Sequence, residues 1–327
     1  MDPITHGLTG AVVSLFDRNR RLPCSGDGEG KSIIRAITLT AMTASVLPDA
    51  DFITRAAGSF AYFKYHRGPS HSLMGILILA VLLTLALGWL YPNIPRRRFF
   101  RWSLICLLLH VGFDLLNTYS TFVLWPFINR PFSLDILMIV DVIIWAIFIG
   151  GLVAARLGRG RLRPAVVGMV TALVFLLYLS TRIYIHTELL QAVQEKYAAD
   201  KPVKIAVIPQ MVGIRDWDYL VDLPDRFIMG TAHFPGSRLR EGRTLVKQQD
   251  KSLVVAAMAS DVARVVSRFS PYLYVETGKN GNVYMVKMVD LRYGLDSMLQ
   301  AQIFLNRDKK VIDSNLQAFD GGSREPK

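Results

Sequence analysis

Histidine and aspartate side chains occur beside or inside apolar segments at spacings that suit metal binding. His66 and His71 lie just before a long apolar run. His110 and Asp114 are spaced i, i+4, so on a helix they share one face with side chains about 6 Å apart. A catalytic divalent ion requires neutral imidazole nitrogens and carboxylates around a position where water is activated. These residues therefore suggest a metal-dependent site.

Three further side chains extend this set, although each also has an ordinary structural explanation. Asp49 and Asp51 follow a proline at the end of an apolar segment, where an Asx turn or a helix cap would use them. His6 lies alone in a short apolar segment, and His110 taken alone could be a satisfied core histidine. Such groups are costly in hydrocarbon unless they are paired or coordinated, so their joint occurrence favours one site. We predict metal ligands from the set His6, Asp49, Asp51, His66, His71, His110 and Asp114.

The arginine between two of these histidines suggests an anionic substrate. A guanidinium beside a metal ion is suited to bidentate capture of a phosphate or carboxylate. The alternative for Arg67 is an ion pair with Asp49 or Asp51. Ser70 or Ser72 is an alternative N-cap of the next helix. The predicted catalytic residues are Arg67, Asp51 and Asp114.

Two aspartates further along the chain have an open relation to this site. Asp135 has an N-cap as its alternative explanation. Asp141 lies deeper in an apolar segment, where an unpaired carboxylate is costly. Whether either joins the metal ligands is left open.

Membrane helices are needed to position these residues. The 327 residues are 51% hydrophobic, and the long apolar runs all precede residue 186. The first two runs are shorter than the roughly 20 residues that span a bilayer comfortably, so tilt or local thinning is expected. We predict a membrane all-α domain over 1–188, with about six segments, and a small α+β domain over 189–327. The six apolar segments are 4–16, 33–47, 72–91, 102–116, 134–157 and 165–185.

Basic residues predict the orientation of these segments. The net charge is +12, but Lys and Arg fall in short clusters at 18–35, 96–101 and 156–163, between apolar runs. That distribution is typical of cytoplasmic loops and argues against nucleic-acid binding. With these clusters inside, six crossings place the N-terminus, every predicted ligand and the C-terminal domain on the outer side. The rule counts only Lys and Arg, so the location of the predicted His and Asp ligands on one side is independent of it.

The C-terminal part changes to a pattern of strands. Segments 203–209, 253–258, 273–276 and 283–289 are predicted strands, and 260–268 is a predicted helix. Asn280-Gly281 between two β-rich runs predicts a hairpin. We expect a small extracytoplasmic α+β module.

Several ordered motifs resemble the YdjM-type family of bacterial inner-membrane proteins. They are Asp2-Pro3-Ile4-Thr5-His6, Leu47-Pro48-Asp49-Ala50-Asp51, His66-Arg67-Gly68-Pro69-Ser70-His71-Ser72, His110-Val111-Gly112-Phe113-Asp114 with Asn117, and Pro131-Phe132. This resemblance implies a multi-pass inner-membrane protein that is a metal-dependent hydrolase. The ligand order is also similar, more distantly, to zinc-dependent phospholipase C and P1-type nucleases, which implies phosphoester chemistry. A later His-x-x-x-Glu pair is absent, so one or two ions are expected rather than three.

The favoured function is a hydrolase that acts on a lipid or lipid-linked phosphoester at the outer leaflet. Mixed His and Asp ligands suit zinc, manganese or iron, and zinc is the ion that we favour. The rival function is a non-enzymatic, metal-stabilised scaffold whose external domain binds an envelope partner. A transporter is disfavoured because the ligands cluster at one leaflet and no inverted repeat is visible. The sequence does not identify the oligomeric state.

Overall fold

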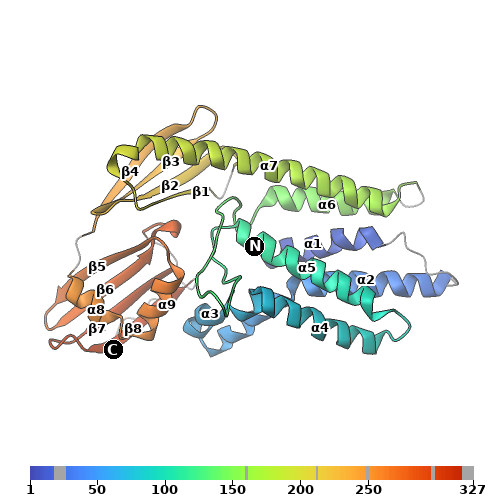
Figure 1. The fold of residues 1–327 in the computed structure, drawn as a ribbon, viewed down its shortest axis with the longest axis horizontal. Helices are drawn as coiled ribbons and strands as arrows, with labels where there is room; N and C mark the ends of the chain where they lie inside the picture. Colours follow the sequence, from blue (N-terminus) through green and yellow to red (C-terminus); the bar gives the residue numbers. More distant parts are fainter. Residues whose placement is uncertain (18–26, 159–160, 211–212, 248–249, 296–298, 319–327) are drawn as a thin grey trace. The chain divides into compact units, whose positions relative to one another are not determined.

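The computed structural model describes residues 1–17, 27–158, 161–210, 213–247, 250–295 and 299–318. Two compact units are present (Figure 1). The helical unit contains Met1–Asp51 and Arg67–Tyr184, and the sheet unit contains Phe52–His66 and Ile185–Lys327. The chain therefore passes between the units after Asp51, after His66 and after Tyr184.

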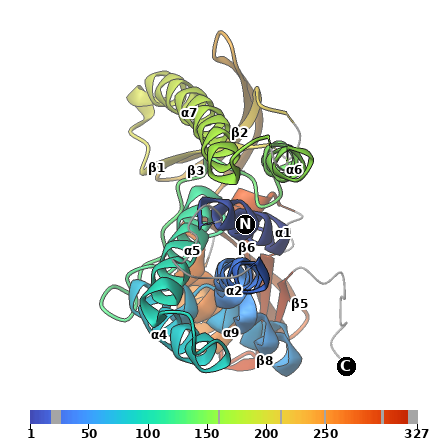
Figure 2. The ribbon, with the colours of Figure 1, turned by 90° about the vertical axis from the view of Figure 1, so that its right-hand side faces the viewer.

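The helical unit is a bundle in which α1 contacts both α2 and α6. Figure 2 shows α1 between these two helices. Helices α4 and α5 contact each other, and both contact α2. The last helix continues into the sheet unit. The helices are α1 (Pro3–Ser14), α2 (Asp27–Val46), α4 (Leu73–Leu90), α5 (Arg96–Leu116), α6 (Val142–Leu157) and α7 (Pro164–Lys196).

Length and composition identify four candidate membrane spans among the described residues. Helices α6 and α1 have 16 and 12 residues, or roughly 24 and 18 Å at 1.5 Å per residue. A bilayer core is about 30 Å thick. The helical N-terminal region is thus confirmed, whereas six crossings and their orientation stay predictions. The four spans are Gly30–Ala57, Leu73–Leu90, Arg96–Leu116 and Pro164–Lys196.

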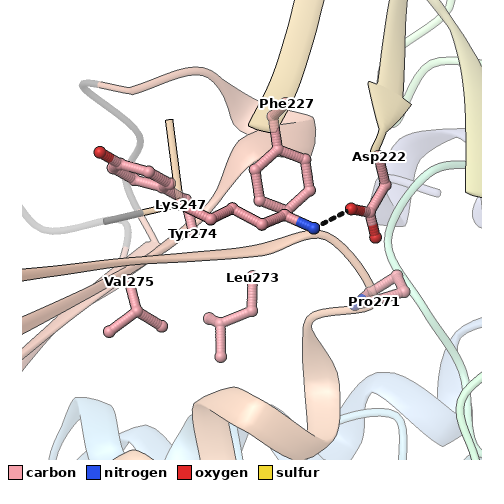
Figure 3. A pocket seen from close by; sticks show the side chains of 7 residues that line it. All are labelled: Asp222, Phe227, Lys247, Pro271, Leu273, Tyr274 and Val275. Carbon is pink, nitrogen blue, oxygen red and sulfur yellow. Dashed lines mark hydrogen bonds and ion pairs between the residues drawn. The ribbon is translucent and has the colours of Figure 1, made fainter. Parts of the chain in front are cut away.

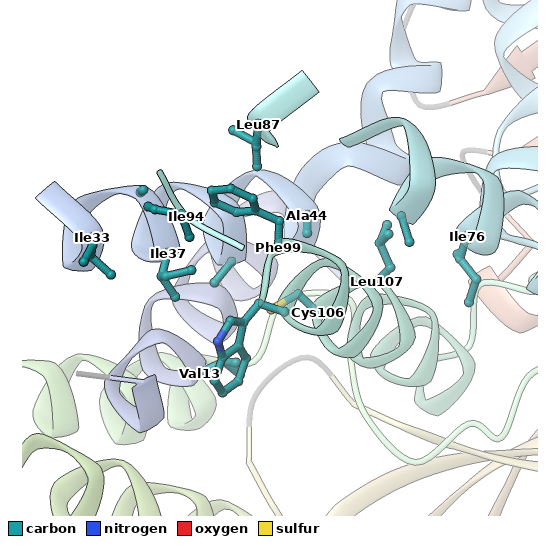
Figure 4. Close-up of a cluster of buried hydrophobic side chains, with 14 of the residues drawn as sticks. Val13, Ile33, Ile37, Ala44, Ile76, Leu87, Ile94, Phe99, Cys106 and Leu107 are labelled. Atoms are coloured by element: carbon teal, nitrogen blue, oxygen red, sulfur yellow. The ribbon is translucent and has the colours of Figure 1, made fainter. Parts of the chain in front are cut away.

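An apolar cluster joins α2, α4 and α5 (Figure 4). Phe99 and Leu107 of α5 are fully buried against Ile37 of α2 and Ile76 of α4. Small residues let membrane helices approach closely. A Cβ atom at Gly10 of α1 would lie 2.5 Å from the Ala41 carbonyl oxygen of α2. Glycine is therefore required where these two helices meet.

Side-chain caps define three helix starts near the predicted site. Asp2 accepts from the Ile4 and Thr5 amides at the start of α1. Ser72 caps α4 through the Gly75 amide at 3.0 Å, which confirms the N-cap alternative for this serine. Asp141 caps α6.

The predicted fifth membrane segment is wrong in its first turns. Helix α6 begins only at Val142. Before it, the amides of Leu134 and Leu137 donate to the carbonyls of Leu115 and Leu116. Three amides of this stretch, those of Leu134, Ile136 and Leu137, are thus satisfied by the end of α5 instead of by helical hydrogen bonds.

The sheet unit contains two four-stranded antiparallel sheets in its described part. In each sheet the strands follow chain order, so every connection joins neighbouring strands. One face of the first sheet packs on the last turns of α7, through Leu189 and Val193 against Trp217. The strands are β1 (Lys204–Pro209), β2 (Asp216–Asp222), β3 (Arg226–His233), β4 (Arg238–Val246), β5 (Leu273–Asn280), β6 (Val283–Asp290), β7 (Leu299–Leu305) and β8 (Val311–Ala318).

Three short helices complete the sheet unit: α8 (Lys251–Ala257), α9 (Asp261–Phe269) and α3 (Ser59–Tyr65). The helix predicted at 260–268 is confirmed as α9. The strand predicted at 253–258 is wrong, because Asp250 caps a helix there through the Ser252 amide. A short apolar run does not by itself separate a strand from a buried helix.

The remaining strand predictions are confirmed, and the hairpin is as expected. Asn280 pairs with Val283 across the β5–β6 turn. Gly281 has φ of 57°, a left-handed conformation that glycine adopts without strain. Strands β2, β3, β4, β7 and β8 were not predicted.

Candidate metal centre

His110 and Asp114 lie on the last two turns of α5 and are buried. The His110 Nδ1 lies 2.6 Å from the Ser45 carbonyl oxygen of α2. A carbonyl only accepts, so Nδ1 carries the proton and Nε2 presents its lone pair. The i, i+4 spacing then brings the Asp114 Oδ2 to 3.4 Å from that Nε2. Both donor atoms face the same point, as the helical spacing predicts.

His71 enters from the short 3-10 turn Pro69–His71 that precedes α4. Its Nδ1 lies 2.9 Å from the Ser70 Oγ and 3.4 Å from the Asp51 Oδ2. The Ser70 hydroxyl itself donates to Asp51 at 2.7 Å. Carboxylates commonly orient metal-binding histidines in this way. The Nε2 of His71 is thereby directed at the Nε2 of His110, 3.1 Å away.

Asp49, in the 3-10 helix Leu47–Ala57 that follows α2, completes a group of four donors with His71, His110 and Asp114. The Asp49 Oδ1 lies 3.3 Å from the His71 Nε2 and 3.6 Å from the His110 Nε2. The Asp114 Oδ2 lies 3.3 Å from the His71 Nε2. All four donor atoms lie within 4.8 Å of one another. Two imidazoles and two carboxylates thus converge from α5, the 3-10 turn Pro69–His71 and the 3-10 helix Leu47–Ala57.

These donors fit a divalent metal ion. Ligands about 2.0–2.1 Å from a tetrahedral ion lie roughly 3.3 Å apart. The five donor distances given above, 3.1–3.6 Å, are close to this value, and the Asp49–Asp114 pair lies within 4.8 Å. The Asp114 Oδ2 is buried and faces the Nε2 atoms of His71 and His110. Two imidazole lone pairs facing each other are also unfavourable without a cation or proton between them. The geometry therefore supports a cation at this point.

A proton partly replaces that cation in the metal-free protein. Burial lowers the pKa of His71, but hydrogen bonds to Asp114, Asp49 and Asp51 outweigh it and raise the pKa to about 10. The three carboxylates thus draw a proton onto the histidine that would otherwise bind the ion.

The second oxygen of Asp114 faces Arg67. The Arg67 Nη2 lies 2.9 Å from the Asp114 Oδ1. Its Nη1 donates to the Asn117 side-chain oxygen at 3.1 Å and to the Tyr119 carbonyl at 2.6 Å. The guanidinium also stacks over the Tyr119 ring. Asp114 is thereby fixed, with one oxygen held by Arg67 and the other facing the histidines.

Three predicted ligands lie outside the four-donor group, and their role as ligands stays a prediction. The His6 ring stacks on His110 with centroids 3.7 Å apart. Asp51 lies behind His71, as described above. His66 belongs to the sheet unit, where its ring stacks on Tyr62 at 4.5 Å.

The ion pair of Arg67 is not with Asp49 or Asp51, the alternative that its position in the sequence suggests. Its guanidinium pairs with Asp114, whereas only its backbone N–H reaches Asp51, at 3.2 Å. Asp141 is also placed differently from the metal ligands, since it caps α6 and accepts from the Tyr178 hydroxyl at 2.6 Å. Asp135 is not at a helix start and has φ of 56°.

Sequence reasoning did not assign the groups that orient the donors. The Ser45 carbonyl has no signature in a sequence, because every residue carries one. Asn117 and Tyr119 could have been considered, since polar side chains just after a helix that ends in a metal ligand are near enough to contact it. The Ser70 contact with Asp51 depends on the turn at Pro69.

The family model of the YdjM inner membrane protein matches residues 1–189. The chain belongs to the YdjM inner membrane protein family. All four donors lie in the matched region. The chain is also 23% identical over 266 residues to the uncharacterized protein YfhP of Bacillus subtilis (strain 168), covering 81% of this chain and 80% of YfhP. No solved structure gives a significant match.

Family membership and the apolar spans establish a membrane protein of the inner-membrane type. The His/Asp group is a possible metal site within it. No comparison bears on the more distant likeness to phospholipase C and P1-type nucleases.

A cavity in the sheet unit is a second place where polar groups meet (Figure 3). Its volume is about 210 Å³, and its lining is mixed, with apolar side chains such as Phe227 and Leu273 beside polar groups. The Lys247 ammonium contacts the Asp222 carboxylate and lies 4.4 Å from the Phe227 ring centroid. Because the two charged groups neutralise each other, we assign no chemistry to this cavity.

Proposed function

We propose that this YdjM-family protein is a membrane-embedded metal-dependent hydrolase of a lipid or lipid-linked phosphoester at the outer leaflet. The observation that carries the proposal is the convergence of Asp49, His71, His110 and Asp114 on one point. Each histidine also has a polar partner at its Nδ1, a carbonyl for His110 and a carboxylate for His71. Such partners are typical of histidines that bind a metal ion through the other nitrogen.

The four donors would hold a divalent ion, for which we favour zinc, with manganese or iron as alternatives. Such an ion supplies Lewis-acid activation of water and offsets the negative charge of a phosphoester transition state. Asp49 is the only donor with an exposed side chain, at 14%, whereas the other three are at 0%. We expect the substrate to approach from the Asp49 side.

Asp51 and Arg67 have supporting roles in this proposal. Asp51 holds His71 through Nδ1, and Arg67 holds Asp114. The phosphate contact predicted for Arg67 would be made by its Nε, which has no hydrogen-bond partner among the described residues. Both Nη atoms are already engaged.

An apolar surface beside the site supports a lipid substrate. Helix α4 begins directly after Ser72, and its first turn exposes Leu73 and Met74 at 49% and 41%. Exposed apolar residues continue along α4 at Leu77 and Ile78. A lipid in the bilayer would therefore reach the centre laterally, without leaving the membrane.

Metal content and turnover test this function together. Elemental analysis of the detergent-purified full chain should give about one divalent ion per chain, and phospholipids and polyprenyl phosphates would be screened as substrates. We expect His110→Ala and Asp114→Ala to lose the ion and all turnover. His233→Ala is a matched control, because this histidine lies in β3 and pairs with Asp216 at 2.7 Å. Wild-type protein that stays metal-free after reconstitution would contradict the proposal.

One observation favours the scaffold alternative. Four protein donors can complete a tetrahedral shell, which is typical of structural zinc. In that case chelation would lower the melting temperature strongly and no substrate would turn over. For the hydrolase we expect chelation to abolish turnover, with turnover restored when the metal is added back.

A further inference from the structure

Residues 52–66, which we name the insert, leave the helical unit between two pairs of site residues. Asp49 and Asp51 come directly before the insert, and Arg67 and His71 come directly after it. The backbone N–H of Arg67 donates to the Asp51 Oδ2 at 3.2 Å, so the two ends of the insert are hydrogen-bonded to each other. Any displacement of the insert is therefore transmitted first to these two residues.

The insert is anchored in the core of the sheet unit. Phe63 is 3% exposed, and its ring centroid lies 4.7 Å from that of Phe269 on α9. Phe60 packs against the apolar cluster beneath the second sheet. Arg268 also donates to the Lys64 carbonyl at 3.5 Å. Two aromatic side chains and a backbone contact thus fix the insert to this unit.

We infer that the sheet unit sets the geometry of the metal centre through the insert, with Phe63 as a positioning residue that acts on Asp51 and Arg67. This inference rests on the proposed function for the presence of an ion. Asp51 lies 3.4 Å from the His71 Nδ1, and Arg67 lies 2.9 Å from the Asp114 Oδ1. Each end of the insert therefore orients one metal donor.

The backbone at Arg67 adds to this argument. Its φ is 54°, a conformation that residues with a side chain rarely adopt. Such conformations persist only where the surrounding contacts hold them. Since Arg67 is the first residue after the insert, loss of the anchor should relax this position and release Asp114 from the guanidinium.

The test compares metal affinity of full-length variants in detergent. Residues that orient metal ligands typically contribute 10- to 100-fold to affinity, and we expect the lower end for an indirect contact. Phe63→Ala and Phe269→Ala should raise the Kd for Zn²⁺ about 10-fold and alter the visible spectrum of bound Co²⁺. Phe227→Ala is the matched control, because Phe227 is also 3% exposed in the sheet unit but packs on Tyr274 and Lys247.

Phe63→Leu keeps most of the apolar volume and should lie between wild type and Phe63→Ala. If Phe63→Ala does not yield folded protein, the metal affinity of Phe63→Leu is compared with that of wild type instead. In an Asp51→Asn background, Phe63→Ala should lose much of its effect, because coupled residues are not additive.

Two outcomes separate this inference from the proposed function. Equal Kd values and Co²⁺ spectra for Phe63→Ala and Phe227→Ala would overturn the inference and leave the metal site intact. A wild-type protein that binds no metal would overturn the proposed function and the inference with it.

Discussion

The two histidines of the four-donor group are held in different ways. His110 donates through Nδ1 to a backbone carbonyl, which fixes its tautomer without adding charge. His71 has a carboxylate behind its Nδ1, at Asp51, and further carboxylates at its Nε2. A carboxylate partner makes an imidazole a more basic ligand. Of the two, His71 is therefore the histidine whose proton must be displaced by the metal.

Metal uptake should release a proton at neutral pH. The pKa of His71 is raised to about 10 in the metal-free protein, after burial is outweighed by its carboxylate partners. A raised pKa stabilises the fold below the ordinary value near 6.5, and this contribution is lost as the pH rises toward 10. Metal ligands must be deprotonated, so we expect about one proton released per ion at pH 7.5.

Calorimetry in buffers of different ionisation enthalpy measures this proton. His71→Gln should bind metal weakly and abolish the release. A buffer-independent heat in the wild type would contradict the protonated state of His71. Without metal, the melting temperature should fall between pH 7 and pH 10.

The sequence was sufficient to predict the four converging side chains, together with three that lie outside the group, but not how each is held. Helical periodicity places His110 and Asp114 on one face, and this was confirmed. Asp49 and His71 were expected from residue type and from proximity to apolar segments, and they do join the group. Asp49 faces the other donors, whereas Asp51 lies at the Nδ1 of His71. This difference depends on the 3-10 helix Leu47–Ala57, which residue spacing alone does not reveal.

Helix α6 depends on a cap that is also a buried polar contact. Asp141 accepts from the amides of Ile143 and Ile144 and from the Tyr178 hydroxyl. Removing an Asp cap typically costs about 1 kcal/mol. We expect Asp141→Ala to lower the melting temperature of the metal-bound protein more than Tyr178→Phe, which keeps the cap. A smaller effect of Asp141→Ala than of Tyr178→Phe, measured by thermal unfolding in detergent, would show that the cap does not stabilise α6.

Two elements, strand β4 and the stretch 134–140, have a composition that does not indicate their structure. Strand β4 is exposed along most of its length and rich in arginine, so it lacks the alternation that reveals a half-buried strand. Its ladder with β3 specifies it instead. The apolar stretch 134–140 has the opposite property, since its composition predicts a helix. Its hydrogen bonds to the end of α5 are not visible in the sequence.

The membrane orientation of the whole molecule is open to a direct test. The basic clusters predict that the C-terminal domain lies outside the cytoplasm. A reporter enzyme that is active only outside the cytoplasm, fused after Lys327, should be active. The same reporter fused within the cluster 96–101 should be inactive. The reverse pattern would place the metal centre at the inner leaflet and exclude an outer-leaflet substrate.

The pairing of Arg67 with Asp114 bears on the charge of the ion that the proposed centre would hold. The carboxylates of Asp49, Asp51 and Asp114 contribute three negative charges, and the guanidinium compensates one. Two negative charges remain among largely buried side chains, where net charge is costly. A divalent ion would make these four side chains electrically neutral, whereas a monovalent ion would leave one negative charge and a trivalent ion one positive charge. If the proposed centre binds an ion, we therefore expect these four side chains to favour a divalent ion by charge alone, before any preference among divalent metals.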